Sequence, residues 1–81
     1  MAHERFLQRG FEKCLAHAVE EAGEFLAAAG KTQRFGGQSV NPLLNPNDQE
    51  RNIDWLRREM KDLRDAFDRL DFAIEEEGLV E

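Results

Sequence analysis

Hydrophobic residues recur at intervals of three and four positions along the first third of the chain. On a helical wheel they form a stripe centred near Ala18. The stripe consists of Leu7, Phe11, Cys14, Ala18, Ala22 and Phe25, with Leu15, Val19 and Leu26 beside it. This spacing is typical of an amphipathic helix and predicts one over about residues 2–29. Gly30 follows directly and is expected to cap the C-terminus of that helix.

A second stripe with the same spacing predicts a helix over about residues 48–77. It consists of Ile53, Leu56, Met60, Leu63, Phe67, Leu70 and Ile74. Asn47 can cap this helix with Glu50 as its capping-box partner, and Pro46 after Asn45 marks an equally good start. Another face of the helix mixes aromatic, small and acidic side chains, as the lining of a pocket does. That face carries Trp55, Glu59, Asp62, Ala66 and Ala73.

Residues 30–47 separate the two helices and are rich in turn signals, including Gly36-Gly37 and Asn41-Pro42. We interpret them as a long loop, and loops of more than about 12–15 residues are usually functional or disordered. The loop also carries Val40, Leu43 and Leu44, so we expect it to fold back onto the helices. No segment has the pattern of a strand. The sequence therefore predicts one all-α domain over residues 1–81, an antiparallel helical hairpin with a long connection.

A lone hairpin of this size cannot bury both apolar stripes well. We therefore expect the chain to form a homodimer or homotetramer in which hairpins associate into a four-helix-type bundle.

Composition narrows the classes of function. The 81 residues include 17 acidic and 11 basic side chains, for a net charge of −6. This balance argues against a nucleic-acid binder and against an anionic membrane surface as partner. Cys14 is the only cysteine, which excludes an intramolecular disulfide and a Cys/His zinc cluster. With no secretory signal and no apolar run of about 20 residues, we expect a cytoplasmic protein.

Two pairs of carboxylates stand out because their spacing places both members on one side of a helix. In VEEAGEF, residues 19–25, Glu21 and Glu24 flank the apolar stripe, whereas Glu20 points roughly opposite. Glu59 and Asp62 form the same i,i+3 pair on the second helix. In so acidic a chain such pairs also arise by chance. Oppositely charged residues at i,i+4, such as Lys61 with Asp65 and Arg58 with Asp54 and Asp62, are equally consistent with a salt-bridged surface.

Taken together, the two pairs resemble the motifs of the MazG-like superfamily, the all-α nucleoside triphosphate pyrophosphohydrolases. These proteins carry EExxE on one helix and ExxD on the next. Here EEAGE supplies Glu20, Glu21 and Glu24, and EMKD supplies Glu59 and Asp62. The order and the helical setting agree over roughly residues 11–74.

The resemblance implies a fold, a metal and a reaction. Glu21, Glu24, Glu59 and Asp62 would hold Mg²⁺, or Mn²⁺ in its place, as oxygen ligands suited to hard cations. Glu20 would either support a ligand or activate water, which makes it the candidate catalytic residue. The implied reaction is hydrolysis of a nucleoside or deoxynucleoside triphosphate to the monophosphate and pyrophosphate. Because the chain is short, its base pocket must come from the long loop or from a partner subunit.

Three further residues are candidates for substrate binding. Lys31 and Arg34 can reach phosphates from the loop, and Trp55 can stack on a base. A P-loop around Gly30-Lys31-Thr32 is excluded, because Phe25 occupies the required glycine position and no strand precedes it. The ExxH motif of di-iron helical bundles is not present, which argues against that class. Two alternatives remain: a non-catalytic helical module that oligomerises or binds a partner helix, and a metal-free nucleotide-binding remnant of the same fold.

Overall fold

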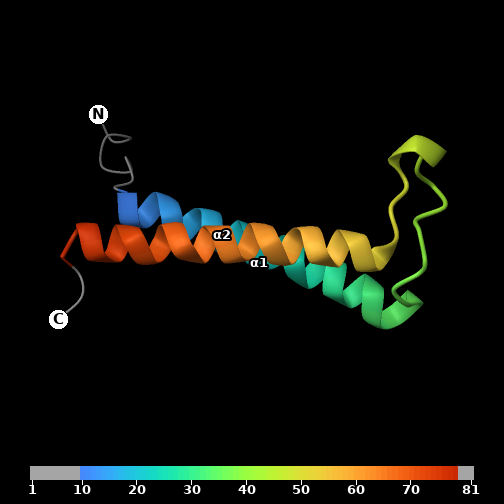
Figure 1. Ribbon diagram of the computed structural model, residues 1–81, viewed down its shortest axis with the longest axis horizontal. Helices are drawn as coiled ribbons and strands as arrows, with labels where there is room; N and C mark the ends of the chain where they lie inside the picture. Colours follow the sequence, from blue (N-terminus) through green and yellow to red (C-terminus); the bar gives the residue numbers. More distant parts are fainter. Residues whose placement is uncertain (1–9, 79–81) are drawn as a thin grey trace, which may run out of the picture.

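The computed structural model describes residues 10–78, which form two long helices joined by a structured connection. Helix α1 spans Gly10–Phe35, a short 3₁₀ helix η2 spans Pro46–Asp48, and helix α2 spans Asn52–Glu76. The two long helices run antiparallel and cross, with the connection at one end (Figure 1). No strand occurs within residues 10–78. The predicted helical hairpin is therefore confirmed, while the predicted helix start at residue 2 and Leu7 lie outside the described residues.

Helix α1 ends later than the sequence predicted. It passes through Gly30 without interruption and stops at Phe35. Gly36 follows with a φ of +89°, a conformation that side chains other than glycine rarely adopt, and its N–H donates to the carbonyl of Thr32 at 2.9 Å. Gly36 rather than Gly30 is therefore the C-terminal cap, and Lys31 and Arg34 lie on the helix rather than on a loop.

Helix α2 begins later than predicted. Asn45 and Pro46 start η2 instead, with proline at the first helical position. Arg51 precedes α2 and provides no side-chain cap. The predicted capping box of Asn47 and Glu50 is therefore wrong, because the backbone changes direction between η2 and α2.

The contact between α1 and α2 is made by small side chains. The buried hydrophobic residues are Ala18, Ala28, Ala66 and Ala73, and no large side chain among residues 10–78 is fully buried. Thus α2 turns its face of small, aromatic and acidic residues toward α1. The stripe predicted to be its buried face is partly exposed, most clearly at Met60 and Phe67. Small side chains allow a closer approach of two helices than leucines and phenylalanines would.

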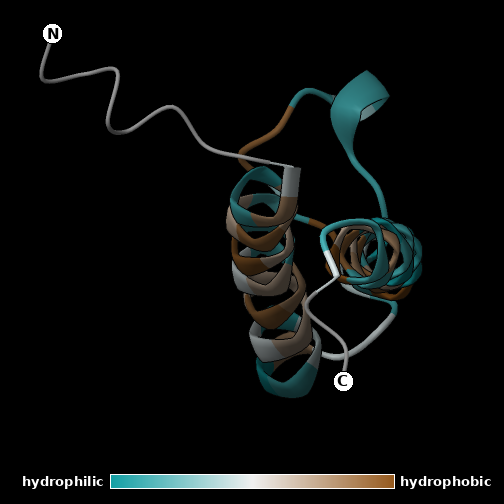
Figure 2. Cartoon of the chain, turned by 90° about the vertical axis from the view of Figure 1, so that its left-hand side faces the viewer, coloured by the Kyte–Doolittle hydropathy of each residue, from teal (hydrophilic) through white to brown (hydrophobic). Residues whose placement is uncertain are grey.

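Five of the seven exposed large hydrophobic residues of the two helices lie on one side of the hairpin, which we call the apolar side: Leu15, Val19 and Leu26 of α1 with Met60 and Phe67 of α2. Phe35 and Phe72 are rotated away from it. We call the face of each helix that packs against the other helix its inward face. On a helical wheel, where successive residues are about 100° apart, the five positions of the apolar side are rotated in the same sense from the inward face of α1 and of α2. In antiparallel neighbours, equal rotations lead to the same side of the pair. Glu21 and Asp62 are rotated in the opposite sense and face the other side. Figure 2 shows brown hydrophobic and teal polar segments on both helices.

The connection is held by its own hydrogen bonds. Asn52 is buried, and its side-chain amide donates to the carbonyls of Gly36 at 3.1 Å and Lys31 at 3.4 Å. Backbone N–H groups of Asn52 and Ile53 donate to Ser39 at 2.8 Å and Gly37 at 2.9 Å. These bonds fix the segment after α1 against the first turn of α2.

The opposite end of the hairpin is also tied together. The carboxylate of Glu77, which follows α2, accepts a 2.6 Å hydrogen bond from the backbone N–H of Phe11 in the first turn of α1. This bond satisfies a donor that a helix N-terminus otherwise leaves free. Within the described residues, neither helix is long and apolar enough to cross a membrane.

Candidate metal centre

Three carboxylates converge between the helices. Glu21 of α1 and Glu59 and Asp62 of α2 each offer an oxygen, and these oxygens all lie within 4.8 Å of one another. Glu59 is buried, whereas Glu21 and Asp62 are partly exposed. We call this group the acid cluster. Its residues come from both motifs, so α1 and α2 of one chain build it without a second subunit.

Two oxygens of the acid cluster are buried and have no hydrogen-bond partner among residues 10–78. They are Oε2 of Glu21 and Oε1 of Glu59. The Glu59 side chain is only 7 % exposed. An unpaired buried carboxylate oxygen is costly, because it has lost water and gained no donor. A divalent cation bound between the carboxylates would supply the missing partner, so the residues present fit such an ion.

The other oxygen of Glu59 is held in place. Oε2 accepts a 3.1 Å hydrogen bond from the indole N–H of Trp55, one turn earlier on α2. It also lies 3.6 Å from the guanidinium of Arg58, which pairs with Glu50 at 2.7 Å. These contacts fix the orientation of the Glu59 carboxylate. They leave Oε1 as the free ligand atom.

Glu21 is placed among charges of both signs. Burial raises the pKa of its carboxyl above the ordinary value, and the neighbouring Glu24 carboxylate raises that pKa further. His17, whose Nε2 lies 3.8 Å from Oε1 of Glu21, opposes the shift. The ionised form of Glu21 is therefore disfavoured here unless a cation compensates for the crowded negative charge.

The two remaining residues of EEAGE lie further from the centre. Glu24 is exposed and adjoins Glu21, but it is not part of the three-residue cluster. Glu20 is exposed as well. Of the five predicted motif residues, the structure brings three together, with Glu24 at their edge and Glu20 outside.

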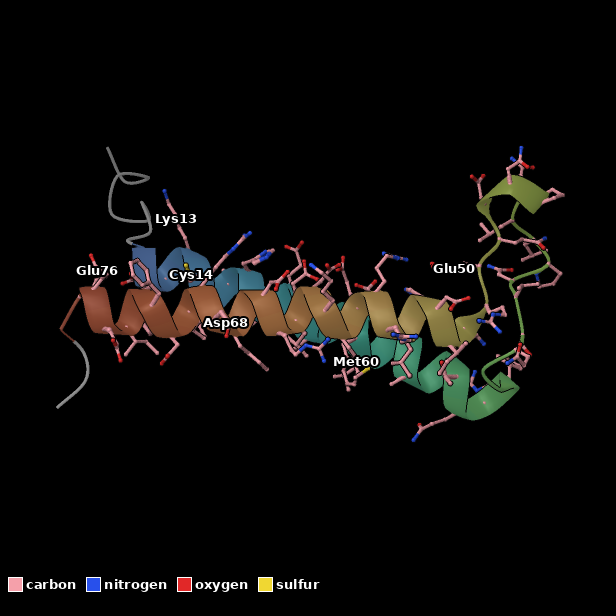
Figure 3. The ribbon with its side chains drawn as sticks, in the orientation of Figure 1. Lys13, Cys14, Glu50, Met60, Asp68 and Glu76 are labelled. Atoms are coloured by element: carbon pink, nitrogen blue, oxygen red, sulfur yellow. The ribbon has the colours of Figure 1, made fainter. Side chains whose placement is uncertain are left out.

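Beside the acid cluster lies a cavity of about 830 Å³ between the connection and the adjoining helix ends, which we call the loop pocket. Its walls include Lys31 and Phe35 of α1, Val40 and Leu43 of the connection, and Trp55 and Arg58 of α2. Of the predicted substrate-binding residues, Lys31 and Trp55 line the pocket. Arg34 does not; its guanidinium lies 5.8 Å from the ring of Phe35. Figure 3 shows Glu50, another wall residue, where the connection meets α2.

The sequence did not reveal two residues that shape this region. Asn52 anchors the connection, and a lone asparagine near a helix start gave no sign that its amide would reach back to α1. Arg58 links the acid cluster to the pocket through Glu59 and Glu50, although its spacing indicated partners at Asp54 and Asp62 instead. Asp54 pairs with Arg51, at 2.8 Å. The predicted pair of Lys61 and Asp65 is confirmed, at 3.1 Å.

Comparison of the chain with protein-family models, with curated proteins and with solved structures gave no match.

Proposed function

We propose that the protein is a Mg²⁺-dependent hydrolase that converts a nucleoside or deoxynucleoside triphosphate into the monophosphate and pyrophosphate. The observation that carries this proposal is the acid cluster with its two buried, unpartnered oxygens. An ordinary salt-bridged surface does not explain them, because surface carboxylates remain hydrated. The agreement of EEAGE and EMKD with the MazG-like motifs supplies the reaction class.

The position of each residue in or beside the acid cluster indicates its role in the proposed reaction. Glu21, Glu59 and Asp62 would hold the metal, and Glu24 lies at the edge of the cluster, where it can add a ligand. A bound Mg²⁺ neutralises phosphate charge and lowers the pKa of a coordinated water. Trp55 orients Glu59, and Arg58 offers a cation where the pocket meets the cluster.

The reaction balances without a further reactant. The oxygen of a water molecule bonds to the α-phosphorus, and the bond from that phosphorus to the α–β bridging oxygen breaks. Pyrophosphate leaves with the bonding electron pair, and one proton passes to solvent. Glu20 is exposed on α1 and touches none of the cluster carboxylates closely enough to belong to it, so we assign it no step.

The proposal includes association of hairpins through the apolar side. The exposed apolar side chains on both helices and the lack of large buried side chains within residues 10–78 support a homodimer or homotetramer. In a four-helix bundle formed this way, each acid cluster faces outward. A reducing cytoplasm fits the single free cysteine.

The test is release of pyrophosphate from a panel of nucleoside triphosphates with Mg²⁺. We expect equimolar monophosphate and pyrophosphate, and a loss of at least about 100-fold in Asp62→Asn, because a metal ligand is removed. Asp71→Asn, an exposed acid elsewhere on α2, is the matched control and should retain full activity. Turnover that is unaffected by Asp62→Asn would reject the assigned site.

A second candidate function is favoured by the apolar side: a non-catalytic module that binds a partner helix there. Absence of turnover with every nucleotide, together with no effect of Mg²⁺ on thermal stability, would favour this alternative.

A further inference from the structure

The loop pocket and the acid cluster lie on the same side of the hairpin. On helical wheels, Lys31 and Phe35 of α1 are rotated from the inward face in the same sense as Glu21. Arg58 of α2 is rotated in the same sense as Asp62. The apolar side faces the other way. Association of hairpins through that side therefore leaves both the pocket and the cluster accessible.

The pocket and the cluster are also joined through shared residues. Trp55 and Arg58 line the pocket, and both contact Oε2 of Glu59. Trp55 precedes Glu59, and Arg58 precedes Asp62, by one turn, or about 6 Å along α2. A ligand that fills the pocket and also reaches the acid cluster therefore needs two chemically different ends that are only a short distance apart.

The walls of the pocket indicate the chemistry of the first end. Four exposed large hydrophobic residues surround it: Phe35, Val40, Leu43 and Leu44. Leu43 is 91 % exposed, so its side chain is not packed against the helices. Trp55 adds a flat aromatic surface. The volume, about 830 Å³, lies within the range of small-molecule sites. The occupant is thus flat and largely apolar in this part.

Polar groups around the same pocket indicate the second end. Lys31 and Arg58 contribute cations. Asp48 and Glu50 contribute carboxylates, of which Glu50 pairs with Arg58 at 2.7 Å. The side-chain amide N–H groups of Asn41 can donate to a heterocycle or a sugar. The hydrogen bonds of Asn52 hold the connection in place before any ligand arrives, so little ordering is required on binding.

We infer that the loop pocket of a single chain binds the nucleobase and sugar of the substrate, with the phosphates directed past Arg58 to the acid cluster. This inference rests on the proposed function and deepens it. It assigns base recognition to the connection and Trp55 rather than to a partner subunit. The substrate class is then nucleotides, in preference to inorganic polyphosphates of the same charge.

Binding can be measured without turnover. The probes are α,β-methylene nucleoside triphosphates, which resist cleavage at the α–β linkage, and inorganic tripolyphosphate, which has no base, each with Mg²⁺. Calorimetry gives both Kd values. Fluorescence of Trp55, the only tryptophan, reports on the pocket. We expect at least one nucleotide analogue to bind about tenfold or more tightly than tripolyphosphate, because stacking of a base on an aromatic ring contributes on that scale. Nucleosides alone should quench Trp55 at higher concentration.

Leu43→Ser is the decisive variant, since the exposed side chain contributes little to folding. It should weaken analogue binding by at least about threefold through the lost apolar contact and leave tripolyphosphate binding unchanged. Phe72→Ser, at an exposed position of α2 outside the loop pocket, is the matched control and should change neither. Asp62→Asn should weaken tripolyphosphate binding while nucleosides still quench Trp55.

The outcomes separate the two proposals. Equal affinities for analogue and tripolyphosphate, with no effect of Leu43→Ser, overturn the pocket assignment but leave the metal centre standing. Quenching by nucleosides without any Mg²⁺-dependent phosphate binding supports the pocket and rejects the proposed hydrolase. A change of oligomeric state in Leu43→Ser overturns the assignment in favour of a second copy of the chain as occupant. Failure of every probe to bind rejects both proposals.

Discussion

The indole N–H of Trp55 donates a 3.1 Å hydrogen bond to Oε2 of Glu59, one helical turn further along α2. Glu59 is 5 % exposed, and its other oxygen has no partner within the described residues. Trp55 therefore binds one carboxylate oxygen of Glu59 and leaves the second available as a ligand atom of the acid cluster. The same indole forms part of the pocket wall, so a single side chain links the two halves of the candidate site.

Glu59→Gln should make the metal-free protein more stable and abolish its response to Mg²⁺. The substitution keeps the size and an acceptor for Trp55 but removes one of three crowded negative charges. Relief of repulsion at these distances is about 1 kcal/mol or more, which is about 4 °C or more in Tm for a domain of this size. Thermal unfolding in a chelator measures the effect. Exposed Glu75→Gln is the control, with a change of less than about 0.5 kcal/mol. A less stable Glu59→Gln would mean that the carboxylate supports the fold rather than a ligand.

Mg²⁺ should stabilise the wild-type protein in proportion to the logarithm of its concentration. An ion that binds only the folded state contributes about 2.7 kcal/mol at a concentration 100 times its Kd. We expect this rise in Tm to disappear in Glu21→Gln and Asp62→Asn, and to persist in Glu20→Gln, because Glu20 lies outside the acid cluster. Equal loss in all three variants would indicate a diffuse ion atmosphere instead of a site.

Stability of the metal-free protein should fall as the pH rises above about 4.5, the ordinary pKa of a glutamate. The pKa of Glu21 is raised in the folded state by burial and by Glu24. The protonated form is then favoured by folding, so its contribution is complete at low pH and is lost as the pH passes through the raised pKa. Chemical unfolding across pH 4–8 in a chelator measures this slope, and Glu21→Gln should flatten it.

Asp54 contributes to the pH dependence of stability with the opposite sign and over a different pH range. Arg51 lowers the pKa of Asp54 below its ordinary value, so that pair stabilises the protein at neutral pH and loses its effect only below about 3.8. The two contributions can therefore be separated. A slope above pH 4.5 that survives in Glu21→Gln contradicts the assignment to Glu21.

Substitution on the apolar side should dissociate the proposed oligomer. Phe67→Ser removes an exposed aromatic side chain from the proposed interface and should shift the protein toward a less stable monomer in sizing chromatography and analytical ultracentrifugation. Phe72→Ser, similarly exposed but rotated away from that side, should leave the mass unchanged. A wild-type protein that is monomeric at all accessible concentrations would contradict the proposed bundle.

Asn52→Ala should loosen the connection. The substitution removes the side-chain bonds to Gly36 and Lys31 and should lower stability by about 1–3 kcal/mol, because each of the two part-buried hydrogen bonds contributes about 0.5–1.5 kcal/mol. Hydrogen exchange should speed up over residues 36–51 more than over α1. Exposed Asn47→Ala is the control, and equal exchange in the two variants would show that the connection is held in another way.

The sequence predicted the helical hairpin because periodic spacing of apolar residues is a local property of each helix. It did not predict which face of α2 meets α1. The larger apolar stripe was the natural choice, but Ala66 and Ala73 permit a closer approach to Ala18 and Ala28, and this selects the face with the acids. Such a choice depends on the fit between two helices and is not visible in either one alone.

For the candidate site, too, the sequence predicted what is local to each helix but not what depends on how the helices pack. Spacing placed Glu21, Glu59 and Asp62 on suitable faces, and the family resemblance grouped them. Helix periodicity alone did not exclude Glu24 from the centre or place Lys31 on the pocket wall, since both depend on where α1 ends and how the helices cross. Gly36 shows the difficulty: Gly30 offers the same local signal for a helix end, yet the helix continues past it.

The bond between Phe11 and Glu77 brings the beginning of α1 and the end of α2 together. The order of the helices along the chain is therefore incidental to their packing. A circular permutant that runs from α2 through a short linker into α1, opened between residues 43 and 44, would preserve the acid cluster. In the same way, a tandem duplication could fuse two hairpins into one polypeptide without disturbing either acid cluster.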